Sequence, residues 1–233
     1  MQFLGTESDE MNATDLMNHV RMRANNDLSV RQKICHALLP LALGLITGFL
    51  AKLVEAVPHF GLSGDLLNLL SGISTDIGPW VLLAAIIAAF SRTPEAAALH
   101  VFVFFAGMLF TYYLYSTLLF HFFPRYYFLR WGIIALVSPV PAFIVWFSRG
   151  KGWVASFCAA LPVGLLITLG YRFLYTHSLV KDLTRGFDLF SAVLLIILLP
   201  RSNSQRLRMI PLAIIVFLII EKLNIISLLF GGL

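Results

Sequence analysis

The sequence predicts an all-α fold, a polytopic membrane helical bundle with six or seven transmembrane helices. Of its 233 residues, 59% are hydrophobic and only 12% are charged, and the mean hydropathy is +0.85. A soluble domain is about 45–50% apolar and about 25% charged. The second observation is a series of apolar stretches near the roughly 20 residues that a helix needs to cross a bilayer. Together these observations exclude the soluble enzyme classes.

Seven hydrophobic stretches carry this prediction. They lie at about 35–57, 78–91, 96–123, 129–148, 153–175, 187–200 and 209–229. The second is short, but it extends backward through LLNLLSGISTDI, which is itself a candidate re-entrant or interfacial helix. The sixth is lengthened by SLVKDLTRGFD, whose charges would project beyond the bilayer. The sequence therefore leaves open whether six or seven stretches cross.

The polar residues 1–33 are expected to form a cytoplasmic N-terminal tail with a short amphipathic helix, followed by a transmembrane helical domain over 34–233. The basic residues favour this orientation, because cytoplasmic loops carry an excess of Lys and Arg. Placing the N-terminus inside puts ten basic residues on the cytoplasmic side and six outside. The ten are Arg21, Arg23, Arg31, Lys33, Arg92, Arg149, Lys151, Arg201, Arg206 and Arg208.

Small residues and prolines indicate how the helices pack. Gly44 and Gly48 form a G-x-x-x-G on the first stretch, and such pairs let helix backbones approach closely in lipid. Two alternatives remain for them, packing within the bundle or docking of a partner subunit. Pro139 and Pro141 in the fourth stretch and Pro162 in the fifth each remove a helical hydrogen bond, which kinks a helix and opens space beside it.

Polar side chains near the outer ends of the stretches predict a binding pocket. Tyr112 and Tyr113 lie too deep for an interfacial belt, and a buried tyrosine hydroxyl needs a hydrogen-bond partner. Lys52 and Glu55 are three residues apart and can pair. Arg130 opens the fourth stretch, Arg172 closes the fifth and Asp188 opens the sixth. Because charge in hydrocarbon is costly, these groups suggest a polar, outward-facing mouth.

The last stretch raises a separate question at Glu221 and Lys222. Met209 to Ile220 is only about 18 Å of helix, too short to cross, whereas continuation to Leu229 gives a full span with both charges near its middle. In one alternative the helix stops near Ile220 and the remainder lies along the interface. In the other, which we favour because of the length, Glu221 faces a polar interior. The candidate ligand-binding residues are therefore Tyr112, Tyr113, Arg130, Arg172, Glu55 and Glu221.

Motifs for catalysis are missing from the sequence. It contains no H-E-x-x-H, G-x-S-x-G or P-loop, and Cys35 and Cys158 lack metal-ligand spacing. These absences favour a protein that is not an enzyme, and we expect no catalytic residue, metal or cofactor. No basic run is interleaved with exposed aromatics, so nucleic acid is not an expected partner.

Three segments, NLLSGISTDIGPWVLLAAIIAAF, TYYLY and GWVASFCAALPVGLLITLGYRFL, resemble a family of small polytopic bacterial membrane proteins of unknown function, over residues of about 68–175. The resemblance implies a bacterial cell membrane and no substrate. In size and helix number the chain is also similar in architecture to the membrane-embedded substrate-binding subunits of energy-coupling-factor vitamin transporters.

Three classes of function follow. The first is a small-molecule binding or transport component with an outward-facing pocket, which depends on a partner for energy. The second is a noncatalytic accessory, immunity or assembly protein that acts through helix contacts with another membrane subunit. The third is an intramembrane enzyme. The lipid bilayer is a partner in all three.

Overall fold

The computed structural model describes residues 13–23, 29–56, 61–121, 123–174 and 179–225, and within these ranges it contains helices and no strand. This confirms the all-α class. The elements are α1 (Ala13–Val20), α2 (Val30–Ala56), α3 (Gly61–Thr75), α4 (Gly78–Phe90), α5 (Pro94–Phe120), α6 (Arg125–Val137), α7 (Pro139–Trp146), η1 (Phe147–Arg149), α8 (Gly152–Gly170), η2 (Tyr171–Leu174), α9 (Leu179–Leu198) and α10 (Asn203–Lys222).

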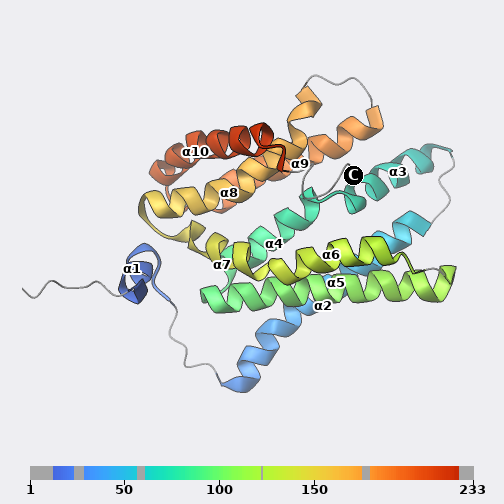
Figure 1. Cartoon of the computed structure of the whole chain (residues 1–233), viewed down its shortest axis with the longest axis horizontal. Coiled ribbons are helices and arrows are strands. Elements are labelled where there is room, and N and C mark those ends of the chain that lie inside the picture. Colours follow the sequence, from blue (N-terminus) through green and yellow to red (C-terminus); the bar gives the residue numbers. More distant parts are fainter. Residues whose placement is uncertain (1–12, 24–28, 57–60, 122, 175–178, 226–233) are drawn as a thin grey trace, which may run out of the picture.

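The helices are long and apolar enough for a multi-pass membrane protein. Five segments qualify alone: Val30–Ala56, Pro94–Leu119, Arg125–Arg149, Gly152–Leu174 and Asn203–Lys222. The helices Leu66–Thr75 and Gly78–Phe90, which meet at a 60° bend, form either a sixth, broken span or a re-entrant loop. The sixth hydrophobic stretch forms α9, which runs alongside α8 but holds four charged residues in its first half (Figure 1).

Helix boundaries follow local signals in the sequence. Ser29 and Gln32 form a capping box at the start of α2, with Gln32 N–H donating to Ser29 Oγ at 3.3 Å and Ser29 N–H to Gln32 Oε1 at 3.0 Å. The first transmembrane helix therefore begins before residue 34. Thr93 caps α5 ahead of Pro94. In the fourth stretch α6 passes into α7 at Ser138, directly before Pro139, but Ser138 keeps helical φ and ψ of −53° and −29° and its N–H donates to the Ile134 carbonyl at 2.9 Å. The two helices count as one span, Arg125–Arg149, and the kink at these prolines stays a prediction.

Two groups of helices make up the bundle, and the broken pair α3–α4 lies between them (Figure 1). In the first group α2 packs on α5, which also contacts α6 and α7. In the second group α8 packs on α9 and α10. The core side chains Phe104, Trp146, Leu166 and Leu195 are completely buried where the groups meet α4.

The glycines of the first span are used inside the chain. A Cβ at Gly44 would overlap the backbone carbonyl of Phe104 in α5, and one at Gly48 would overlap that of Met108. Thr111 Oγ1 also donates to the carbonyl of Leu45 across this contact, at 2.9 Å. Gly44 and Gly48 therefore pack within the bundle, which was the first of the two alternatives. This face of α2 leaves no free surface at the two glycines for a partner subunit.

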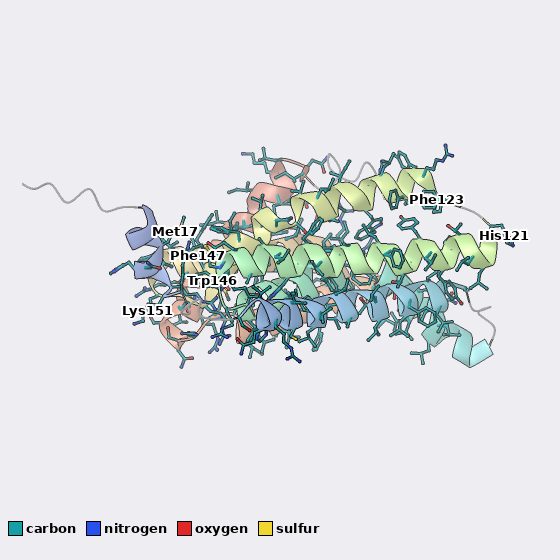
Figure 2. The ribbon with its side chains drawn as sticks, turned by 90° about the horizontal axis from the view of Figure 1, so that it is seen from below. Met17, His121, Phe123, Trp146, Phe147 and Lys151 are labelled. Carbon is teal, nitrogen blue, oxygen red and sulfur yellow. The ribbon has the colours of Figure 1, made fainter. Side chains whose placement is uncertain are left out.

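The bundle has two chemically different ends. At the basic end lie α1, the α4–α5 turn and the connections from α7 to α8 and from α9 to α10. Figure 2 places Met17, Trp146, Phe147 and Lys151 at that end and His121 and Phe123 at the opposite end. The expected amphipathic helix is α1, and Met17 and Val20 pack against the core. The N-terminal segment thus lies on the bundle itself.

Candidate functional site

A cavity of about 1020 Å³ lies at the opposite end, between the two groups of helices. Among the side chains that the structure describes, its charged lining is balanced, with three cations and three acids: Lys52, Arg172, Arg185, Glu55, Asp76 and Glu221. Six aromatic side chains face the same space: Trp80, Tyr112, Tyr113, Tyr127, Trp131 and Tyr171. The volume suits a small molecule, because ligand pockets usually measure about 300–1,000 Å³.

One wall of the cavity is a cluster around Glu55, built from α2 and α5. Tyr112 O–H donates to Glu55 Oε2 at 2.6 Å, and Lys52 Nζ lies 3.1 Å from Glu55 Oε1. The same ammonium lies 5.0 Å from the centroid of the Tyr112 ring. The expected Lys52–Glu55 pair is therefore present. Tyr113 beside it is only 4% exposed and packs edge-on against Phe128.

The facing wall holds a second cluster of the same composition around Glu221. Tyr171 O–H donates to Glu221 Oε1, and Arg172 Nη2 lies 4.0 Å from the same oxygen. Tyr171 also packs on Phe217, with ring centroids 5.1 Å apart. A carboxylate, a phenol and a cation thus stand on each side of the cavity, one set on each group of helices.

The favoured interpretation of the last hydrophobic stretch was wrong about the helix. α10 begins at Asn203, capped by the Ser202 side chain, and ends at Lys222, so Glu221 lies at its end and not in its middle. The helix gains its length at the N-terminal side, where the polar segment that contains Arg206 and Arg208 forms its first turns. Asn224 then adopts a positive φ of 52°. The Glu221 carboxylate lines the cavity and is 41% exposed, so its role in a polar interior stays a prediction. Residues 226–229 of the predicted continuation lie outside the described residues.

The break between α3 and α4 supplies the floor of the cavity. Asp76 accepts a hydrogen bond from the Ile77 N–H at 2.7 Å, beside the N-terminus of α4, where negative charge is favourable. Trp80 Nε1–H donates back across the break to the carbonyl of Ser74 at 3.2 Å. Trp80 is 6% exposed, so it belongs to the core rather than to an interfacial belt.

Asp188 does not open the sixth span at a mouth, as the sequence suggested. Because α9 begins at Leu179, Asp188 lies in its middle and is completely buried. Its carboxylate abuts Gly78, where a Cβ would overlap it. Within the described residues neither carboxylate oxygen accepts a hydrogen bond. A buried acid against Gly78, at the break between α3 and α4, is a functional candidate.

The cavity brings together five of the six predicted ligand-binding residues: Glu55, Tyr112, Tyr113, Arg172 and Glu221. Arg130 stands apart from this lining. Its guanidinium stacks on Tyr126 within α6, with Cζ 4.1 Å from the ring centroid. The binding role of all six residues stays a prediction.

Sequence reasoning missed several lining residues, among them Asp76, Tyr171 and Arg185. Tyr171 precedes the predicted Arg172, and Arg185 lies in the charged extension of the sixth stretch, so the signal was present. No such signal pointed to Asp76, because the helix break that brings it to the cavity is a tertiary feature. In the described part of the chain no group of three His, Cys, Asp or Glu side chains has the arrangement of a metal site.

Comparison with known proteins identifies a family for this chain. A family model described as "Family of unknown function (DUF6518)" matches residues 27–231. No curated protein and no solved structure matches the chain.

Proposed function

We propose that this chain, which belongs to the family of unknown function DUF6518, is a small-molecule binding or transport component of a membrane. The observation that carries the proposal is the cavity between the two helix groups, with one carboxylate–phenol–cation cluster on each wall. Such clusters offer hydrogen-bond donors and acceptors in fixed positions. The aromatic rings supply apolar contact area. A few fixed polar groups among aromatic side chains are the usual composition of a ligand pocket.

The charge balance of the lining indicates the class of ligand. Three cations face three carboxylates, so the summed charge favours neither anions nor cations over distance. A neutral or zwitterionic molecule with a ring or other flat body fits this lining best. The carboxylates would accept its donors, and Tyr113 would contact its apolar part.

A partner would supply energy for transport. The sequence contains no phosphate-binding loop, and transport against a gradient requires an energy source. The position of the cavity between two packed groups suits a motion in which one group moves against the other, as alternating access requires. The partner would be a second membrane subunit that couples an energy source to this motion.

The orientation we propose is a cytoplasmic N-terminus in a bacterial cell membrane, with the basic end inside and the cavity facing outward. The charges carry this proposal, because Arg and Lys are retained on the cytoplasmic side. A reporter that works only in the cytoplasm is expected to be active when it is fused after residue 23 or after residue 202. A reporter that works only outside is expected to be active when it is fused in the 175–178 connection. The reverse pattern would place the cavity on the cytoplasmic side.

Ligand binding is expected to depend on Arg172 and not on Arg130. Zwitterionic and neutral metabolites would be screened for an increase in the melting temperature of the purified protein in lipid nanodiscs. For any compound that binds, Arg172→Ala should weaken the affinity at least about tenfold, the range for loss of one charge-assisted hydrogen bond.

Arg130→Ala is the matched control for this experiment. It removes the same side chain at the same end of the bundle, next to a tyrosine, but outside the cavity. Its affinity should equal that of the wild type. Equal losses in both variants, or binding that survives Arg172→Ala and Glu221→Gln together, would refute the cavity as the binding site.

A further inference from the structure

A second cavity, of about 1080 Å³, lies at the basic end beneath α1, far from the site described above. Six cations line it: Arg21, Arg23, Arg92, Arg149, Lys151 and Arg201. Among the side chains that the structure describes, no carboxylate joins this lining. This space therefore has the opposite character to the first cavity, where the charges balance.

Three of the six cations have structural partners. Arg21 donates to the carbonyls of Ala89 at 3.0 Å, Ser91 at 3.3 Å and Trp146, at the C-terminal ends of α4 and α7. Arg149 donates to the Leu198 carbonyl at the end of α9, at 2.7 Å. Cations at helix C-termini complement the free carbonyls and the helix dipole.

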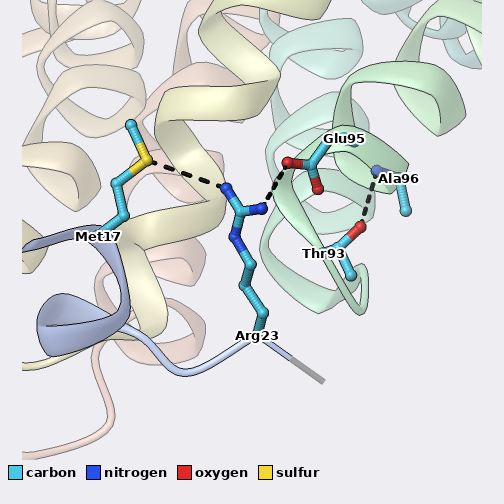
Figure 3. A network of polar contacts seen from close by, with 5 residues as sticks. All are labelled: Met17, Arg23, Thr93, Glu95 and Ala96. Atoms are coloured by element: carbon cyan, nitrogen blue, oxygen red, sulfur yellow. Dashed lines mark hydrogen bonds and ion pairs between the residues drawn. The ribbon is translucent and has the colours of Figure 1, made fainter. Parts of the chain in front are cut away.

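Arg23 is the third cation with a partner. Its guanidinium lies 3.0 Å from Glu95 Oε1, and a contact to the Met17 sulfur at 3.9 Å ties it to α1 (Figure 3). Glu95 sits in the first turn of α5 and does not line the cavity. Glu95 is thus already paired with a cation of this site.

The other three cations, Arg92, Lys151 and Arg201, make no side-chain hydrogen bond or ion pair within the described residues. All three are exposed around one space. Of these three, Arg201 also acts on Arg21: burial first, and then the charges of Arg201 and Arg149, lower the pKa of Arg21 to about 10. Like charges gathered without counter-charges repel one another unless an anion neutralises them.

The rim of the cavity is apolar and points away from the bundle. Phe90, Trp153 and Val154 belong to the lining and are 55%, 61% and 53% exposed. They lie at the ends of membrane-spanning helices, where a bilayer changes from headgroup to hydrocarbon. A ligand that fills this site would carry a negative group for the cations and apolar chains for the rim.

We propose that the basic cavity binds the phosphate headgroup of an anionic phospholipid. Arg92, Lys151 and Arg201 hold the phosphate, while Phe90 and Trp153 contact the acyl chains. Basic pockets at the ends of transmembrane helices are suited to such headgroups. Because α1 and Arg23 close one side of the space, the lipid would also hold the N-terminal segment against the bundle.

The test measures lipid selectivity in nanodiscs of phosphatidylcholine doped with phosphatidylglycerol. Lipids that stay with the protein after extraction are counted by native mass spectrometry. The wild type should retain phosphatidylglycerol at least about tenfold over phosphatidylcholine, with the preference falling as salt is raised. Neutralising Arg92, Lys151 and Arg201 together with Gln should reduce this preference to within about twofold.

The matched control neutralises three cations at the opposite end, Arg125, Arg130 and Lys222, with Gln. It changes the net charge equally and should keep the preference. A preference that survives the first triple variant, or falls equally in both, overturns the proposal. If the first triple variant does not fold, Arg92→Gln and Arg201→Gln alone must each lower the preference.

Free anions form the last arm of the test. Inorganic phosphate and glycerol phosphate are added to the wild type in phosphatidylcholine nanodiscs, and the melting temperature is recorded. If either raises it as much as phosphatidylglycerol does at equal concentration, the site binds soluble phosphate and the lipid assignment is wrong. No shift with the soluble anions, together with a rise with the lipid, supports the assignment.

Discussion

Gly44→Ala is expected to lower the melting temperature of the purified protein by about 2–12 °C. The added methyl group would overlap the carbonyl oxygen of Phe104, a backbone atom that cannot turn away. α2 must then move off α5, the helix against which it mainly packs. Overpacking of this kind costs about 1–3 kcal/mol, and about 2–4 °C accompanies each kcal/mol in a chain of this size.

Gly132→Ala is the matched control, because it makes the same chemical change in another membrane helix. A Cβ at Gly132 in α6 meets no atom within 4 Å. The variant should melt at the wild-type temperature or slightly above it, since Ala is the better helix former by up to about 1 kcal/mol. Thermal unfolding in detergent, followed by circular dichroism, measures both. Equal melting temperatures for the two variants would contradict the close α2–α5 contact.

Arg21→Met is expected to release the N-terminal segment from the bundle. The substitution keeps an apolar stem but removes the hydrogen bonds to the carbonyls of Ala89, Ser91 and Trp146, of which the Ser91 carbonyl keeps a second donor in Trp146 Nε1–H. It also removes the guanidinium that stacks 4.0 Å from the Trp146 ring centroid. Hydrogen bonds from charged groups contribute about 1.5–3 kcal/mol each, so we expect a loss of at least about 2 kcal/mol.

Limited proteolysis measures the release of this segment. Cleavage between α1 and α2 should become at least about tenfold faster in Arg21→Met, because cleavage follows the population of the open form. The control is Arg23→Met, which removes a partly exposed ion pair worth about 0–1 kcal/mol, and its cleavage rate should change less than fivefold. Unchanged cleavage in Arg21→Met would show that α1 is held by its apolar side alone.

The two glutamates of the cavity illustrate how far sequence reasoning reaches. Charge in hydrocarbon is costly, which was reason enough to select Glu55 and Glu221 as candidates. The partner of Glu55 within its own helix, Lys52, followed from their spacing. The partner of Glu221, Tyr171, comes from another helix 50 residues away, and no spacing rule reaches that far.

The misplaced helix ends have one cause. Residues 201–208 are polar, so hydropathy assigned the start of the last span to Met209, whereas the helix begins at Asn203. Hydropathy detects the bilayer-facing part of a helix, but hydrogen bonding and capping determine its ends. The same effect moved Asp188 from the start of a helix to its middle, and from an expected mouth into the core.

The sequence by itself determined that this is a helical membrane protein, where most of its spans lie, and which charged and aromatic residues require a polar environment. These properties depend on composition and on local spacing along one helix. Only the tertiary structure decided that Gly44 and Gly48 face α5, that Arg130 stands outside the cavity, and that six cations surround a second one. Each of these depends on which helix faces which, a choice set by packing between segments that are distant in the chain.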